Sequence, residues 1–181
     1  MALFWITGSA GTGKTTICKK LKEKGYVSYD IDDDGLARWT NLKSGYTHPK
    51  SSVSKEQRTA EFINTHGWFV PRSTAEEVAT ESEGKLGFLC GVLDNYNELL
   101  DLFDGIVALN TDDETLKLRL RTRTTGDWGK QEHELQHTLG RHRTVYDQYR
   151  DMGAKIIDAT KPVEQVIDEI VQIASSKSTH S

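Results

Sequence analysis

The sequence feature that most constrains the fold is a glycine-rich loop between an apolar run and a helix-like stretch. Residues 8–15 read Gly-Ser-Ala-Gly-Thr-Gly-Lys-Thr and match the phosphate-binding pattern G-x-x-x-x-G-K-[ST] in full. Residues 3–6 before the loop are apolar, and residues 16–24 after it have a helical pattern. Such a loop leaves a buried strand, turns on glycines and points backbone N–H groups at phosphates from a helix N-terminus. We therefore expect this chain to bind a nucleoside triphosphate.

Individual residues of the loop have separate expected roles. Lys14 is expected to reach the β- and γ-phosphates as a catalytic cation, and the Thr15 hydroxyl is expected to bind Mg²⁺. The predicted cofactors are therefore ATP and Mg²⁺. The predicted nucleotide-binding residues of the loop are Gly8, Ser9, Ala10, Gly11, Thr12, Gly13, Lys14, Thr15 and Thr16.

Length and composition limit the class of protein. The 181 residues suit a single domain over residues 1–175, followed by a flexible tail over 176–181. A net charge of −4 argues against a nucleic-acid or membrane-surface binder, and no apolar run approaches the ~20 residues that span a bilayer. Cys18 and Cys90 lack metal-ligand spacing and are interpreted as buried residues of a cytoplasmic protein. We expect a monomer or homodimer.

Apolar runs alternate with helical patterns along the chain, which is typical of a parallel α/β sheet. The closing helix is predicted from an apolar stripe over residues 163–174, and Gly25 is a plausible left-handed cap for the first helix. We predict a three-layer α/β fold with a five-stranded parallel sheet, whose strands cover residues 3–7, 26–31, 86–93, 105–109 and 155–157.

Two stretches interrupt this alternation. Residues 33–84 are polar and dotted with aromatic residues, and residues 122–138 are charged and contain glycine. Because insertions at strand ends commonly form substrate lobes and lids, we predict an acceptor-binding lobe over the first stretch and a short lid over the second. Surface decoration is the alternative for either one. The first stretch mixes flat rings with cations, and its candidate acceptor-binding residues are Arg38, Arg58 and Arg72.

Two acidic residues lie at the end of the second predicted strand. Strand alternation places Asp30 and Asp32 on the same side of an extended chain. Mg²⁺ usually takes one or two carboxylates and keeps several waters, so Asp30 is a candidate metal ligand. Asp32 is a candidate catalytic and acceptor-binding residue. The alternative is that these carboxylates only stabilise a turn or cap a helix.

Basic residues cluster in a later helical segment. Arg119 and Arg123 are four residues apart and therefore share one helix face, and no acid occurs in residues 117–123. Cations around a transferring phosphoryl group stabilise the charge that develops there. We predict that Arg119 and Arg123 are catalytic and that Arg119 also binds nucleotide.

Residues 133–137 read His-Glu-Leu-Gln-His and match the zinc-protease pattern H-E-x-x-H. A catalytic zinc usually has a third protein ligand. His142 lies five residues after His137, about 140° around a continuous helix, and cannot join on that face. We interpret the segment as part of the predicted lid and keep the metal site as the alternative.

Together these residues resemble the small-molecule kinases of the adenylate kinase-like P-loop group, especially shikimate kinase-like enzymes. The motif D-x-D of that group is matched by Asp30-Ile31-Asp32, and R-x-x-x-R is matched from Arg119 to Arg123. The resemblance implies that one acid assists Mg²⁺ and the next holds or deprotonates an acceptor hydroxyl. It also implies that the first arginine lies near adenine and the second near the phosphates, with Lys161 and Pro162 beside the base.

The acceptor remains open at this point. The shikimate-binding glycine triplet is absent from the sequence. A hydroxyl acceptor (nucleoside, sugar or cyclic alcohol) is favoured because Asp32 can serve as a base and the insertion offers only scattered arginines. The alternatives are a nucleoside monophosphate kinase, with Arg38 and Arg72 gripping the acceptor phosphate, and a regulatory ATP-binding or ATPase module.

Overall fold

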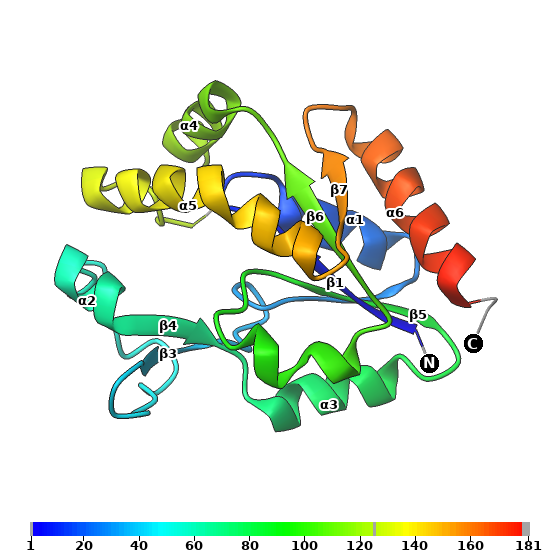
Figure 1. Ribbon diagram of the computed structural model, residues 1–181, viewed down its shortest axis with the longest axis horizontal. Helices are drawn as coiled ribbons and strands as arrows, with labels where there is room; N and C mark the ends of the chain where they lie inside the picture. The colour runs from blue at the N-terminus through cyan, green and yellow to red at the C-terminus, as the bar shows by residue number, and fades with distance from the viewer. Residues whose placement is uncertain (1, 125, 179–181) are drawn as a thin grey trace.

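Five parallel strands form the central sheet of the computed structural model, which describes residues 2–124 and 126–178 (Figure 1). The strand order is β2-β5-β1-β6-β7, so the loop after β1 leaves the middle of the sheet. The predicted five-stranded parallel sheet is confirmed. The strand bounds are β1 Ala2–Thr7, β2 Val27–Asp30, β5 Leu86–Cys90, β6 Gly105–Asn110 and β7 Lys155–Asp158.

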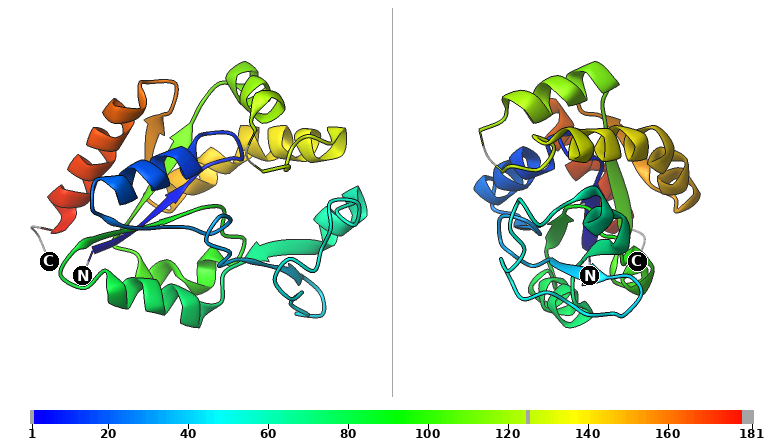
Figure 2. Two further views of the ribbon diagram at one scale, coloured as in Figure 1. Left: turned by 180° about the vertical axis from the view of Figure 1, so that it is seen from behind. Right: turned by 90° about the vertical axis from the view of Figure 1, so that its left-hand side faces the viewer.

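Helices cover both faces of this sheet (Figure 2). Side chains alternate along β1, so Phe4 and Ile6 pack against one helical layer while Leu3 and Trp5 pack against the other. The first layer contains α1 Lys14–Glu23 and α6 Val163–Ser178, which contact each other and the strands. The second contains α3 Arg72–Glu81 and α5 Glu132–Asp151. The β1 strand is thus buried on both faces, as its unbroken apolar sequence indicates.

The first helix ends in a glycine cap. The Gly25 N–H donates to Lys22 O at 3.0 Å and the Tyr26 N–H donates to Leu21 O at 3.1 Å. This pair of bonds is the Schellman arrangement, and it requires the left-handed φ of +89° that Gly25 adopts. The cap predicted at Gly25 is therefore confirmed, and it returns the chain to the sheet for β2.

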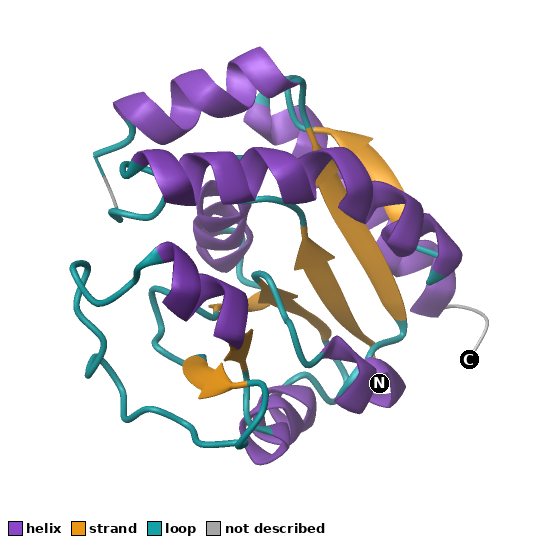
Figure 3. Ribbon diagram, turned by 60° about the vertical axis from the view of Figure 1, so that its left-hand side comes forward, coloured by secondary structure: helices purple, strands orange, loops and turns teal. Residues whose placement is uncertain are grey.

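The long insertion forms a small lobe beside the sheet (Figure 3). Strands β3 Arg38–Asn41 and β4 His66–Phe69 pair antiparallel, and α2 Ala60–Thr65 precedes β4. The lobe is shorter than the predicted range of 33–84, because α3 packs its buried face on β5 and thus belongs to the helical layer of the sheet. Two short 3₁₀ turns, η1 Tyr96–Glu98 and η2 Leu100–Leu102, follow β5.

The predicted lid consists of a loop and the first turns of α5. Helix α4 Asp113–Thr122 ends just before Arg123, and α5 begins at Glu132. Thr125 lies outside the described residues. Helix α6 continues through Ser178, beyond the predicted start of the tail at residue 176, and residues 179–181 lie outside the described part of the chain. Within the described ranges, no helix has the length and apolarity needed to cross a bilayer.

The cap at Gly25 yields a stability prediction with an internal control. Gly25→Ala should destabilise the fold by about 1–2 kcal/mol, because a left-handed φ strains a residue with a Cβ even where, as here, no atom lies within 4 Å. Gly140→Ala, in the exposed middle of α5, should stabilise it by about 0.5–1 kcal/mol. Urea unfolding of both variants checks the opposite signs; a stabilised Gly25→Ala would contradict the cap.

Candidate active site

A cleft of about 1080 Å³ lies at the carboxyl ends of the sheet strands, between the glycine-rich loop, the small lobe and the lid. Parallel α/β sheets place ligands at this edge because the loops after neighbouring strands meet there. The cleft is lined by residues from every part of the predicted site. They include Ser9, Ala10, Gly11, Thr12, Gly13, Lys14, Thr15, Thr16, Asp32, Arg58, Arg119, Arg123 and Lys161.

The glycine-rich loop has a backbone that only glycine fits at its first position. Gly8 has φ +134°, and a Cβ there would lie 2.4 Å from the carbonyl oxygen of Leu109 on β6. Gly13, with φ +101°, forms the N-cap of α1. The loop therefore runs directly into the N-terminus of α1, where the helix dipole is positive, and this N-terminus faces the cleft. This concave backbone fits a phosphate chain.

Helix α5 holds the loop from behind. The His142 ring contacts Ser9 Oγ through Nδ1 at 2.9 Å and the Thr111 carbonyl through Nε2 at 2.8 Å. The Tyr146 hydroxyl donates to Leu109 O at 2.6 Å. Sequence reasoning considered His142 only as a zinc ligand and missed this role, since nothing in the local sequence indicates which loop a helical histidine will contact.

Lys14 lies in the loop as predicted, and its side chain is buried. Its ammonium donates to Gly8 O at 2.7 Å and to Ser9 O at 2.9 Å. Burial lowers the pKa of Lys14 to about 8, although the nearby carboxylates of Asp32 and Asp30 oppose that shift. The cation is thus held at the loop with fewer polar partners than water would supply, and an anion would stabilise it.

Asp30, the last residue of β2, and Asp32, in the turn that follows, have different surroundings. Asp30 is buried, and its Oδ1 accepts the backbone N–H groups of Asp32 at 2.9 Å and Asp33 at 3.1 Å. Asp30 is absent from the cleft wall, so the structure does not bring this predicted metal ligand to the site. Its carboxylate stabilises the turn because it replaces water as the acceptor for two N–H groups.

Asp32 does reach the cleft, as predicted. Its Oδ1 accepts the indole N–H of Trp68 at 2.7 Å. The surrounding protein, followed by the negative charge of Asp30, raises the pKa of Asp32, although the side chain retains contact with the solvent of the cleft. Thr15 and Asp32 line the same cleft and supply the hard oxygen donors that Mg²⁺ prefers, so these two residues fit a largely hydrated magnesium ion.

The two arginines predicted to be catalytic, Arg119 and Arg123, also reach the cleft. Arg119 donates to Ala159 O at 2.9 Å and to Thr12 O at 3.4 Å, which joins α4 to the glycine-rich loop. Arg123 donates to Trp128 O, while its buried Nε has no hydrogen-bond partner among the described residues. That unpaired donor fits an anionic oxygen, because a buried N–H without an acceptor is costly.

The loop after β7 is placed only in part as expected. Lys161 lines the cleft and pairs with Glu169 at 2.8 Å. Pro162 is not among the lining residues, whereas the neighbouring Val163 is.

Two of the predicted acceptor-binding arginines lie elsewhere. Arg38 donates to Gly35 O at 2.7 Å and to Ala37 O at 2.8 Å, so its guanidinium stabilises its own turn. Arg72 is an exposed residue at the start of α3, and its side chain pairs with Asp101 at 2.5 Å and with Glu76 at 2.9 Å. Neither residue lines the cleft, because nearby acceptors hold both side chains. The structure therefore does not bring these two predicted acceptor-binding residues to the site.

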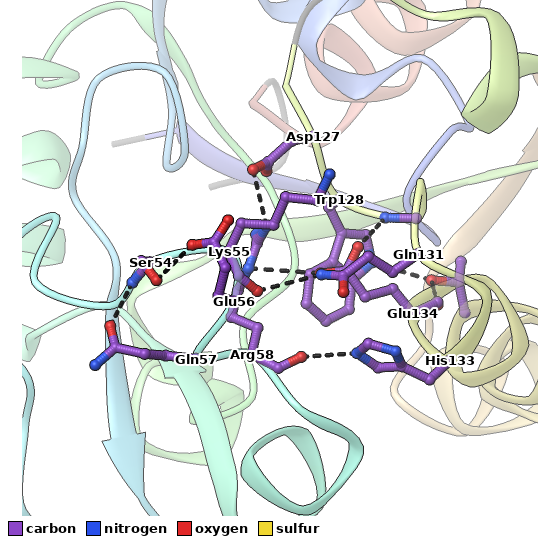
Figure 4. A network of polar contacts seen from close by, with 12 residues as sticks. Ser54, Lys55, Glu56, Gln57, Arg58, Asp127, Trp128, Gln131, His133 and Glu134 are labelled. Atoms are coloured by element: carbon purple, nitrogen blue, oxygen red, sulfur yellow. Dashed lines mark hydrogen bonds and ion pairs between the residues drawn. The ribbon is translucent and has the colours of Figure 1, made fainter.

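The third, Arg58, lines the cleft and joins the small lobe to the lid (Figure 4). Its guanidinium pairs with Asp127 at 2.9 Å and approaches Glu134 Oε1 at 3.5 Å, while its carbonyl contacts His133 Nε2 at 2.7 Å. Gln131 adds a bond to the carbonyl of Lys55 at 3.2 Å. These contacts bring residues 54–58 of the lobe against residues 127–134 of the lid.

This network also accounts for the H-E-x-x-H residues. Glu134 is fully buried, and its carboxylate accepts the Gly129 N–H at 2.9 Å in addition to facing Arg58. The ring of His137 packs edge-on against Trp128. In the described part of the chain, no group of three or more His, Cys, Asp or Glu residues is arranged to hold a metal ion. The segment serves as the joint between lid and lobe.

Removing one partner of this buried pair should be costly. Glu134→Ala should destabilise the fold by about 3–5 kcal/mol, since it leaves Arg58 (11% exposed) buried beside a missing charge. Gln136→Ala, on the exposed side of the same helix, should change stability by less than about 0.5 kcal/mol. Thermal unfolding with and without EDTA measures both. A neutral Glu134→Ala, with wild-type stability lost on chelation, would favour the zinc alternative.

Comparison with known proteins agrees with this geometry. A shikimate kinase from Acinetobacter baumannii has a TM-score of 0.60 at 19% identity, covering 97% of this chain and 94% of that one. A gluconokinase from Sinorhizobium meliloti 1021 has a TM-score of 0.55 at 14% identity, covering 99% and 97%. A deoxyadenosine kinase from M. mycoides has a TM-score of 0.55 at 15% identity, covering 95% and 98%. These likenesses show the P-loop kinase fold.

Sequence comparison gives a shorter match and a family. A curated adenylyl-sulfate kinase of Clostridium acetobutylicum is 41% identical over 49 residues, which cover 25% of this chain and 24% of that relative. The match thus spans about a quarter of the relative's length. The family model described as an AAA domain (AAA_18) matches residues 5–140, which include the glycine-rich loop, the small lobe and the lid. The chain therefore belongs to this AAA domain family, and its fold is that of the P-loop kinases.

Proposed function

We propose that this protein is a kinase that transfers the γ-phosphoryl group of Mg-ATP to a hydroxyl of a small molecule. The observation that carries the proposal is the composition of the cleft. The phosphate loop forms one wall, a separate lobe forms the other, and a carboxylate with a raised pKa, Asp32, lies in the same cleft. A kinase needs these three parts in one water-excluding space.

The donor half is proposed from the charges that face the loop. The triphosphate accepts hydrogen bonds from backbone N–H groups of the loop and of the α1 N-terminus. The Lys14 ammonium exchanges its hydrogen bonds to the Gly8 and Ser9 carbonyls for bonds to the phosphates. Arg123, with its unpaired Nε, and Arg119 neutralise the charge of the transferring group. Mg²⁺, held by the Thr15 hydroxyl and by waters that face Asp32, would supply further charge neutralisation when bound.

The acceptor half depends on Asp32. Its raised pKa makes the carboxylate a better proton acceptor at neutral pH. We propose that Asp32 takes the proton of the acceptor hydroxyl as its oxygen bonds to the γ-phosphorus and the bond to ADP breaks. The indole N–H of Trp68 fixes Oδ1, which leaves the other carboxylate oxygen to face the acceptor.

The alternatives predict different sites. A nucleoside monophosphate kinase needs an arginine cradle for a second phosphate, and Arg38 and Arg72 are held by other partners outside the cleft. A regulatory ATPase needs no acceptor wall, yet the small lobe and the lid enclose the space in front of the loop. Both observations favour transfer to a hydroxyl.

The role of Asp32 is tested by conservative substitution. Asp32→Asn should lower kcat for phosphorylation of the acceptor by about 10²–10⁴-fold, because the amide cannot take the proton. Affinity for ATP without metal should change little. Steady-state kinetics with γ-labelled ATP, together with equilibrium ATP binding, separate the two quantities. Asp33→Asn is the neighbouring control, since Asp33 pairs with Lys19 at 2.9 Å. An equal loss in binding and kcat would contradict the proposed base.

The pKa of Lys14 predicts how ATP affinity depends on pH. Bound phosphate stabilises the ammonium and therefore raises this pKa above the value of about 8 in the free protein. Affinity should be constant below pH 8 and should fall as the pH rises through it, because binding then requires uptake of a proton. Titration calorimetry from pH 7 to 10 tests this, with Lys14→Arg as the variant that should lose the dependence. A flat wild-type profile would overturn it.

A further inference from the structure

Three tryptophans line the acceptor side of the cleft, beside the carboxylate of Asp32. Trp39 comes from β3, Trp68 from β4 and Trp128 from the lid, so the two parts that face the glycine-rich loop meet through indole rings. Phe62 of α2 packs edge-on against Trp39 with ring centroids 5.4 Å apart. The aromatic surface is therefore built from segments far apart in the chain.

These rings are held in place by their neighbours. Trp39 lies between the other two indoles, with centroids 4.9 Å from Trp68 and 5.9 Å from Trp128. The Trp128 N–H donates to Thr138 Oγ1 at 3.0 Å, and the guanidinium of Arg58 lies 5.7 Å from its ring centroid. Rigid aromatic faces of this kind bind flat rings because little side-chain entropy is lost on stacking.

Cations on this side of the cleft are already paired with acids. Arg58 is bound to Asp127 and Glu134, and Arg141 is bound to Asp94 at 2.6 Å. An acceptor with a carboxylate or phosphate would lose its hydration, would have to compete with these acids for Arg58 and Arg141, and would also lie near Asp32. Desolvation of an unpaired anion is costly, so this wall selects against acids.

Several polar groups of this wall already have partners as well. Asp94 accepts the Trp68 backbone N–H at 2.7 Å besides pairing with Arg141, and His66 contacts His48 Nε2 at 3.2 Å and Phe62 O at 3.0 Å. A polyol buried here would leave several hydroxyls without partners, which costs more than stacking one sugar face returns. The wall thus presents flat indole rings next to the Asp32 carboxylate oxygen that Trp68 does not bind.

From this arrangement we propose that the acceptor is an uncharged molecule with an aromatic ring, which stacks on Trp39, Trp68 and Trp128 and presents a hydroxyl to Asp32. The inference rests on the proposed kinase function and narrows its acceptor. The hydroxyl oxygen bonds to the γ-phosphorus, the bond from that phosphorus to the β–γ bridging oxygen breaks, ADP leaves and Asp32 receives the proton. Nucleosides and hydroxymethyl heterocycles have the required chemistry, while sugars, hydroxy acids and nucleotides lack part of it.

Binding can be measured without turnover, because three of the four tryptophans lie in the cleft while Trp5 is buried in the core. We would titrate the protein, with a non-hydrolysable ATP analogue bound, with adenosine, cytidine, thymidine and pyridoxine, and in parallel with glucose, gluconate, shikimate and AMP. For at least one probe of the first group, tryptophan quenching should saturate at a concentration about tenfold or more below that needed for any probe of the second group. Mass spectrometry of reactions with ATP should show the matching phosphomonoester.

Substitution then tests which rings are responsible. Trp39→Leu should raise the KM of the best aromatic probe about tenfold or more, with ATP affinity unchanged. Tyr46→Leu, which removes an exposed ring of the same lobe outside the cleft, should leave both unchanged. Circular dichroism checks that both variants fold. If either does not, the wild-type titrations with the eight probes still test the inference. ATP-dependent phosphorylation of a sugar, an acid or a nucleotide in preference to every aromatic probe would overturn this inference alone, whereas absence of ATP binding would overturn the proposed function.

Discussion

The contact between Gly8 and the Leu109 carbonyl is the constraint on which the site depends. A Cβ at position 8 would lie only 2.4 Å from that oxygen, so no side chain fits there. Because glycine has no Cβ, the chain can turn from β1 into α1 close beside β6. The turn points backbone N–H groups and the helix dipole into the cleft. Tyr146 and His142 of α5 then fix both sides of the loop through Leu109 and Ser9. These contacts hold the glycine-rich loop against β6 and α5.

The acceptor half is organised differently, because it belongs to the small lobe and the lid and not to the sheet. The Arg58 network joins these two parts, and the buried carboxylate of Glu134 makes that joint sensitive to the loss of either charge. Trp128 lies on the lid beside Arg58, so movement of the lid would also move one wall of the proposed ring pocket. The proposed acceptor pocket and the joint between lid and lobe therefore share Arg58 and Trp128.

The sequence predicted the sheet and the donor half because both are encoded locally. An apolar run, fixed glycines and a helical pattern specify the loop, and helix periodicity places Arg119 and Arg123 on one face that reaches the cleft. Strand alternation did not distinguish Asp32 from Asp30, because β2 ends at Asp30 and the turn after it brings Asp32, and not Asp30, to the cleft. The failures at Arg38 and Arg72 have one cause: an arginine binds the nearest acceptors, here the Gly35 carbonyl and Asp101, and those neighbours are set by tertiary packing. The roles of His142, Glu134 and the tryptophans depend on contacts between distant segments, for which a single sequence has no periodic signal.

Phosphoryl transfer to an acceptor is the central claim, and ³¹P nuclear magnetic resonance tests it most directly. The protein would be incubated with Mg-ATP and a mixture of uncharged aromatic alcohols, and the phosphorus resonances would be followed with time. The account predicts that ADP and a new phosphomonoester resonance grow in equal amounts, with little inorganic phosphate. Growth of inorganic phosphate alone, at a rate independent of the mixture, would contradict it and identify an ATPase.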